Sequence, residues 1–216
     1  MYCRLTRAKF LFPLILATAL LMQPVTVAAQ GKTQKISKKL IDRAEDMIKE
    51  IDKTKKQVDN TVKKYDSVFS KKKVKDRQNA YKDLSKEIKK TEDRVKEARK
   101  RSDDMGKEAD KFFSEWSKGL TSIEDTELRS LSQATMTETR DRYGKIIESG
   151  ATANGLYESF LTDLKNQSSY LELDMSDGGM EKLKPSQAET KAKASGLSSS
   201  IKDLVTATKG YISSMK

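Results

Sequence analysis

The sequence predicts an all-α protein, an elongated antiparallel bundle or set of coiled-coil hairpins with about four helices. Apolar residues recur at alternating spacings of three and four over long stretches, which places them on one helix face. Hydrophobic residues make up 36% of the chain and charged residues 35%, a balance typical of long helices with narrow apolar stripes. Prolines occur only at positions 13, 24 and 185, so little interrupts a helix between residues 32 and 184.

The first 29 residues predict a cleaved signal peptide. They begin with three basic residues, Arg4, Arg7 and Lys9. An apolar run over residues 10–22 follows, and Val27-Ala28-Ala29 offers the small residues that precede a cleavage site. The alternative is an uncleaved membrane anchor, but the run is short for a span of about 20 residues. We therefore expect export to the periplasm or cell envelope of a bacterium, and one helical domain over residues 30–216 with no transmembrane helix.

The first helix is expected over residues 36–69, where the alternating spacing runs from Leu40 to Val68. Continuing its register by sevens would place Lys72, Lys75 and Asn79 in the core. Lysines do not belong in an apolar core, so the register breaks there. The sequence favours a turn after residue 69, and hence an antiparallel hairpin, over one continuous helix.

The second helix is expected over residues 74–117 and carries the most regular pattern of the chain. We call this pattern the apolar seam; its members are Tyr81, Leu84, Ile88, Thr91, Val95, Ala98, Ser102, Met105, Ala109, Phe112 and Trp116. Lys118-Gly119 then resembles a helix stop. A seam of this regularity serves an intramolecular bundle and self-association equally well, so a homo-oligomer is also open.

The third helix is expected over residues 126–173, with Ser122 or Asp125 as its N-cap. Glycines at 144, 150 and 155 predict a bend or a close helix contact. Asp174 to Ser186, which contains Asp177-Gly178-Gly179 and Pro185, predicts a loop. The last helix is then expected over residues 186–214, where the alternating spacing returns from Ala194 to Met215.

Residue types argue against an enzyme. The chain has no histidine, and its one cysteine, Cys3, lies in the predicted signal peptide. The usual general base, thiolate nucleophile and soft metal ligands are therefore absent from the predicted mature chain, and we expect no cofactor and no metal. Carboxylate pairs such as Asp103-Asp104 lie among basic residues, as on a solvated helix face. The aromatic group Phe112, Phe113 and Trp116 favours core packing over a ligand platform, with only Phe113 off the seam.

Charge gives the one hint of a binding surface. Residues 30–118 hold 28 basic and 18 acidic residues, whereas residues 119–216 hold 12 and 14. The excess peaks at the expected turn between the first two helices, in five basic residues: Lys71, Lys72, Lys73, Lys75 and Arg77. These are candidates for binding an anionic envelope surface or a protein partner. Nucleic acid is not expected, because no aromatic residues accompany the lysines and the chain is predicted to be exported.

Four short elements stand out in the second half of the chain: Glu115-Trp116, Leu128-Arg129 with Ser132, Thr139 with Arg142-Tyr143, and Tyr211-Ile212. In these elements the chain resembles a family of exported bacterial proteins, domain of unknown function 2959. The resemblance implies a helical, envelope-located protein and brings no known activity. We expect a structural or adaptor protein of the cell envelope that binds through its basic hairpin. The alternative is a periplasmic holdase chaperone for exported proteins.

Overall fold

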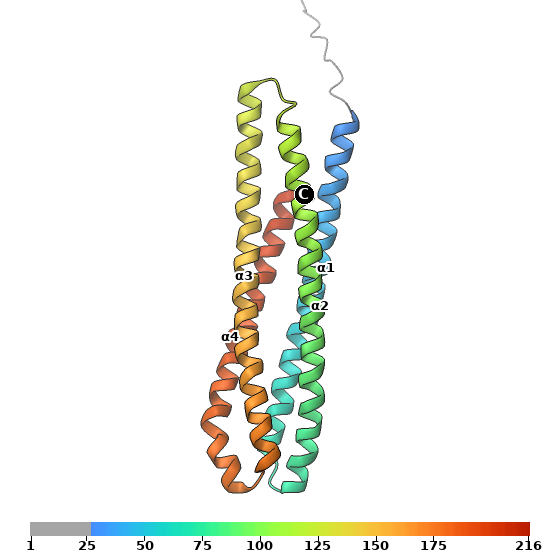
Figure 1. The fold of residues 1–216 in the computed structure, drawn as a ribbon. Coiled ribbons are helices and arrows are strands. Elements are labelled where there is room, and N and C mark those ends of the chain that lie inside the picture. Colours follow the sequence, from blue (N-terminus) through green and yellow to red (C-terminus); the bar gives the residue numbers. More distant parts are fainter. Residues whose placement is uncertain (1–26) are drawn as a thin grey trace, which may run out of the picture.

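The computed structural model describes residues 27–216, with side chains from Gln34 onward. It contains four helices, α1 (Val27–Ser70), α2 (Val74–Leu120), α3 (Thr126–Leu173) and α4 (Asp177–Met215), and no strand among the described residues (Figure 1). The predicted all-α fold with four helices is confirmed. The predicted signal peptide lies almost wholly outside the described residues, and its cleavage stays a prediction.

The helices form a bundle in which each helix packs against two neighbours. α1 packs against α2 and α4, and α3 against α4 and α2, whereas the diagonal pair α1 and α3 meets through side chains such as Tyr65 and Gln167. The α1–α2 and α3–α4 pairs pack most extensively, whereas α2 and α3 pack most loosely. The α1–α2 and α3–α4 loops lie at one end of the bundle, and the α2–α3 loop and the start of α1 lie toward the other (Figure 1).

The first hairpin forms where the register of the sequence breaks. Residues 71–73 connect α1 to α2, as predicted. The core of α1 includes two buried threonines, Thr54 and Thr61. Each donates its hydroxyl to a carbonyl one turn earlier, and Thr61 Oγ1 also lies 2.7 Å from Thr91 Oγ1 of α2. Internal hydrogen bonds therefore let polar residues occupy core positions of this hairpin.

α2 continues three residues beyond its predicted end. Gly119 does not stop the helix, because Leu120 is buried and holds the last turn against the core. The backbone N–H groups of Thr121 and Ser122 donate to the carbonyls of Lys118 and Gly119, which closes the helix end without a left-handed residue.

The predicted loop over residues 174–186 is wrong. Only residues 174–176 connect α3 to α4, and the Ser176 hydroxyl caps α4 by accepting from the N–H of Gly179 at 3.1 Å. Met180 and Leu183 are buried, so the early turns of α4 also have an apolar face. Pro185 lies inside the helix on its exposed side, where water can satisfy the carbonyl that loses its intrahelical donor.

The sequence predicted a bend or a close helix contact at the glycines of α3, and the close contact is not found. A Cβ atom added at Gly144, Gly150 or Gly155 would meet nothing within 4 Å outside the local helix. α3 is continuous through all three positions. These glycines therefore lie next to open space.

Replacing Tyr211 by phenylalanine should stabilise the folded protein. The residue is 1% exposed, and its hydroxyl has no hydrogen-bond partner among the described residues. Burial raises the pKa of Tyr211, so the hydroxyl stays neutral. Leaving a buried hydroxyl unpaired costs about 1–3 kcal/mol, so Tyr211→Phe should raise the free energy of unfolding by about 1 kcal/mol in urea titrations.

Tyr65→Phe is the matched control for this substitution. Tyr65 is also 1% exposed, but its hydroxyl donates to Gln167. Its replacement should lower the free energy of unfolding. Shifts of the same sign in the two variants would contradict the assignment of Tyr211 as an unpaired group.

Candidate functional site

Four of the five predicted anion-binding residues form a surface at the end of the first hairpin. We call Lys71, Lys72, Lys73 and Lys75 the lysine tip. All four side chains are exposed, and none forms an ion pair with a described residue. Three lie in the short α1–α2 loop and the fourth in the first turn of α2. The four residues therefore lie together at the end of the first hairpin.

Arg77 has a different role from the one expected. It is 6% exposed, and its guanidinium joins the two hairpins. Nε donates to the carbonyl of Lys71 and Nη1 to the carbonyl of Met175, each at 2.8 Å. Nη2 donates to Asp177 Oδ1 at 2.5 Å. With its donors engaged inside the fold, Arg77 is a clamp between loops and not part of the anion-binding surface.

The neighbouring loop carries the opposite charge. Asp174 and Asp177 lie beside the α3–α4 connection at the same end of the bundle, and the Asp177 side chain is 87% exposed. Hydrogen bonds from Ser176 lower the pKa of Asp174, so its carboxylate remains ionised. The basic surface is therefore one-sided: the α1–α2 loop is positive and the α3–α4 loop is negative.

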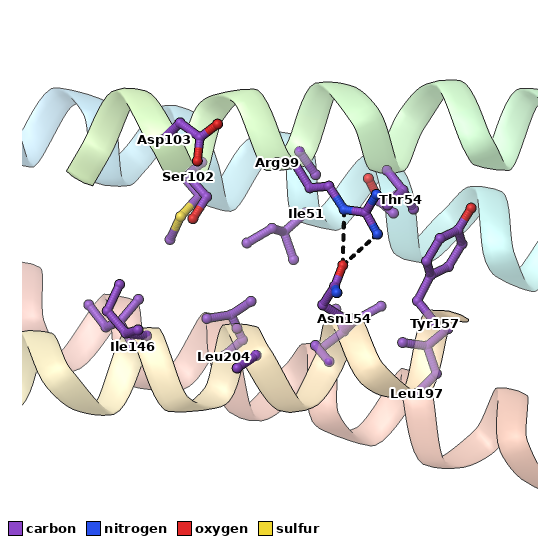
Figure 2. Close-up of a pocket in the computed structure, with 18 of the residues that line it drawn as sticks. Ile51, Thr54, Arg99, Ser102, Asp103, Ile146, Asn154, Tyr157, Leu197 and Leu204 are labelled. Carbon is purple, nitrogen blue, oxygen red and sulfur yellow. Dashed lines mark hydrogen bonds between the residues drawn. The ribbon is translucent and has the colours of Figure 1, made fainter. Parts of the chain in front are cut away.

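The structure contains a second candidate site, which the sequence did not predict. A cavity of about 500 Å³ opens between α2 and α3, part-way along the bundle, and reaches all four helices (Figure 2). This volume lies within the range of about 300–1,000 Å³ that is common for small-molecule pockets. Its walls are largely apolar and include Met47, Ile51, Val95, Ile146, Leu197 and Ile201.

The cavity exists because small residues stand where two helices would otherwise meet. In the apolar seam of α2, Ala98 is half-buried and Ser102 is exposed, although seam residues on both sides are buried. Across the opening, α3 presents Gly150, Ala151 and Ala153. Small side chains from both helices leave the gap unfilled. The signs of this site in the sequence were the two small residues within the seam and Gly150 of α3.

A polar group lies at the mouth of the cavity. Arg99 donates from Nε and Nη2 to Asn154 Oδ1, at 2.9 and 2.6 Å, and also from Nη2 to Glu158 (Figure 2). Its guanidinium carbon lies 5.8 Å from the ring centroid of Tyr157. Burial, with the nearby carboxylates of Glu92 and Glu158, raises the pKa of Tyr157 to about 12. At the mouth, the Arg99 guanidinium is thus held beside the uncharged side chain of Tyr157.

The aromatic residues near the end of α2 belong to the core. Phe112 and Phe113 are buried, and their ring centroids lie 5.3 Å apart. Phe113, which the seam left unassigned, packs against Tyr143 of α3 at 6.1 Å and beneath the guanidinium of Arg140 at 5.0 Å. It therefore faces α3.

Among the described residues, no group of three or more histidine, cysteine, aspartate or glutamate side chains could hold a metal ion. No helix in the part of the chain described here is long and apolar enough to cross a membrane.

The fold and these two sites define a class of protein, a four-helix bundle with a surface lysine loop and a lateral cavity. The family is then given by sequence comparison: the chain belongs to the family described as "Protein of unknown function (DUF2959)", which matches residues 30–215. The resemblance seen in the short sequence elements is confirmed. No curated protein and no solved structure matches the chain.

Proposed function

We infer that the protein is a non-enzymatic binding protein of the bacterial cell envelope whose lysine tip contacts an anionic surface. The observation that carries this proposal is the exposure of four lysines with no ion pair to a described residue, gathered at one end of the bundle. Each basic residue near an anionic lipid surface contributes about 1 kcal/mol to binding. Four together are sufficient for reversible attachment.

The support beneath the lysine tip strengthens the proposal. The α1–α2 loop has only three residues, and Arg77 ties its backbone to the α3–α4 loop through Met175. The ammonium groups therefore project from a braced turn, which limits the ordering cost on binding. Location in the envelope is part of the proposal and is supported by the composition of the N-terminal residues.

Replacing the four lysines of the lysine tip by glutamate should abolish sedimentation with anionic vesicles. The wild-type chain should sediment with vesicles that contain phosphatidylglycerol, less so at higher salt, and not with pure phosphatidylcholine. Vesicle sedimentation and circular dichroism, read in parallel, separate lost binding from lost folding.

The matched control makes the same change of charge elsewhere. Lys82, Lys89, Lys96 and Lys100 are exposed along α2, away from the loop. Their replacement by glutamate should leave most of the sedimentation in place. Equal loss in the two variants would show an effect of net charge and would overturn the proposal. Suppression of client aggregation by both variants, without vesicle binding by the wild type, would favour the holdase alternative.

A further inference from the structure

We propose that the cavity between α2 and α3 binds a single acyl chain that carries an acidic head group, with Arg99 holding the head. This site is separate from the lysine tip, and the proposal does not depend on the function inferred above. It rests on the shape of the cavity, on its apolar walls and on the arrangement of polar groups at its mouth.

The shape of the cavity favours one narrow chain. Its lining covers residues 47–58 of α1 and residues 146–157 of α3, a length of about 16 Å at about 1.5 Å per residue. A volume of about 500 Å³ spread over that length leaves a cross-section of about 30 Å². Such a space suits a single extended hydrocarbon chain better than a fused ring system.

The walls supply the affinity for the chain. The floor is made by residues such as Ile51, Leu197 and Ile201, which are each at most 6% exposed and have no polar side-chain atom. Buried apolar area contributes about 25 cal/mol per Å² removed from water. The buried threonine in the lining, Thr54, already donates its hydroxyl to the carbonyl of Glu50. A ligand therefore does not need to supply a hydrogen-bond acceptor for it.

The mouth supplies the preference for an acidic head. The guanidinium of Arg99 presents a fork of donors that matches a carboxylate or phosphate. Asn154 and the Tyr157 ring hold it at the cavity edge. Its present acidic partner, Glu158, is half exposed, and exposed ion pairs contribute only about 0–1 kcal/mol. An incoming head group can therefore replace Glu158 at little cost.

The other charged residue of the lining sets the direction of the ligand. Asp103 follows Arg99 by one helical turn on α2 and lines the same opening (Figure 2). Like charges repel, so an acidic head is placed toward Arg99 and away from Asp103. The acyl chain then lies below the opening between α2 and α3, along the floor that α1 and α4 form.

The first test fills the cavity. Gly150→Leu puts a side chain into space where a Cβ meets nothing within 4 Å, on the wall of the cavity. Gly155→Leu is the matched control, since Gly155 is equally open but is exposed and does not line the cavity. Calorimetric titration of the purified chain with dodecanoate, below its micelle concentration, should show at least tenfold weaker binding for Gly150→Leu only.

The second test separates the contribution of the acidic head group to binding from that of the acyl chain. Arg99→Gln should weaken dodecanoate binding about tenfold and leave dodecanol binding unchanged, whereas Arg101→Gln, outside the lining, should change neither. Absence of dodecanoate binding by the wild type, equal weakening by the two glycine variants, or equal weakening of both ligands by Arg99→Gln would overturn the proposal. Thermal melts of every variant identify any loss of folding, and Gly150→Leu should melt no lower than the wild type.

Discussion

Replacing Arg77 by methionine should lower the free energy of unfolding by about 3 kcal/mol, because charge-assisted hydrogen bonds contribute about 1.5–3 kcal/mol each. The guanidinium is nearly buried and donates to two carbonyls, those of Lys71 and Met175, as well as to Asp177. Methionine keeps the aliphatic volume but removes every donor. Urea titration followed by circular dichroism measures the change.

Asp177→Asn is the control for this prediction. It removes the acidic partner but keeps both bonds from Arg77 to backbone carbonyls. Because the Asp177 side chain is 87% exposed, water screens its attraction to Arg77 in the wild type. The loss should stay below about 1 kcal/mol, as for exposed ion pairs. Equal losses in the two variants would mean that the ion pair, and not the carbonyl clamp, joins the hairpins.

Gln167→Leu should lower the free energy of unfolding by about 3 kcal/mol, because it removes three hydrogen bonds of a buried side chain at about 1 kcal/mol each. Gln167 of α3 accepts from the hydroxyl of Tyr65 on α1, which lies diagonally across the bundle. Its amide nitrogen donates to Thr190 Oγ1 at 2.7 Å and to the carbonyl of Ser186 at 3.2 Å, both on α4. Urea titration again measures the loss.

The matched variant removes the whole polar group. Tyr65→Phe, Gln167→Leu and Thr190→Val together leave few unpaired side-chain atoms in the core, so the triple variant should recover most of the stability lost in Gln167→Leu. Additive losses from the three substitutions would contradict the view that these side chains act as one network.

Much of the fold was predictable because an apolar face needs only the order of residues along one helix. The lysines that follow Val68 showed where the first hairpin turns. The start of α4 was missed because Asp177, Gly178, Gly179 and Pro185 are typical of loops. Their placement in a helix depends on the Ser176 cap and on burial of Met180 and Leu183. That burial arises from tertiary packing, which the local sequence does not show.

The candidate sites were predictable only where their residues are neighbours in the sequence. The lysine tip follows from adjacent residues, but nothing in the sequence distinguishes Arg77 from the lysines beside it. Its burial depends on a carbonyl at Met175, 98 residues away. The cavity depends on which part of α3 faces Ala98 and Ser102, and periodicity identifies the inward face of each helix without pairing the two.

The lysine tip lies one helix length away from the start of α1. α1 has 44 residues, and the lysine tip follows its last residue, so the two ends of this helix are separated by about 66 Å at about 1.5 Å per residue. The packing of α2 and α4 along α1 keeps this separation fixed. If the lysine tip binds a surface as proposed, that surface is held about one helix length away from anything that binds at the start of α1.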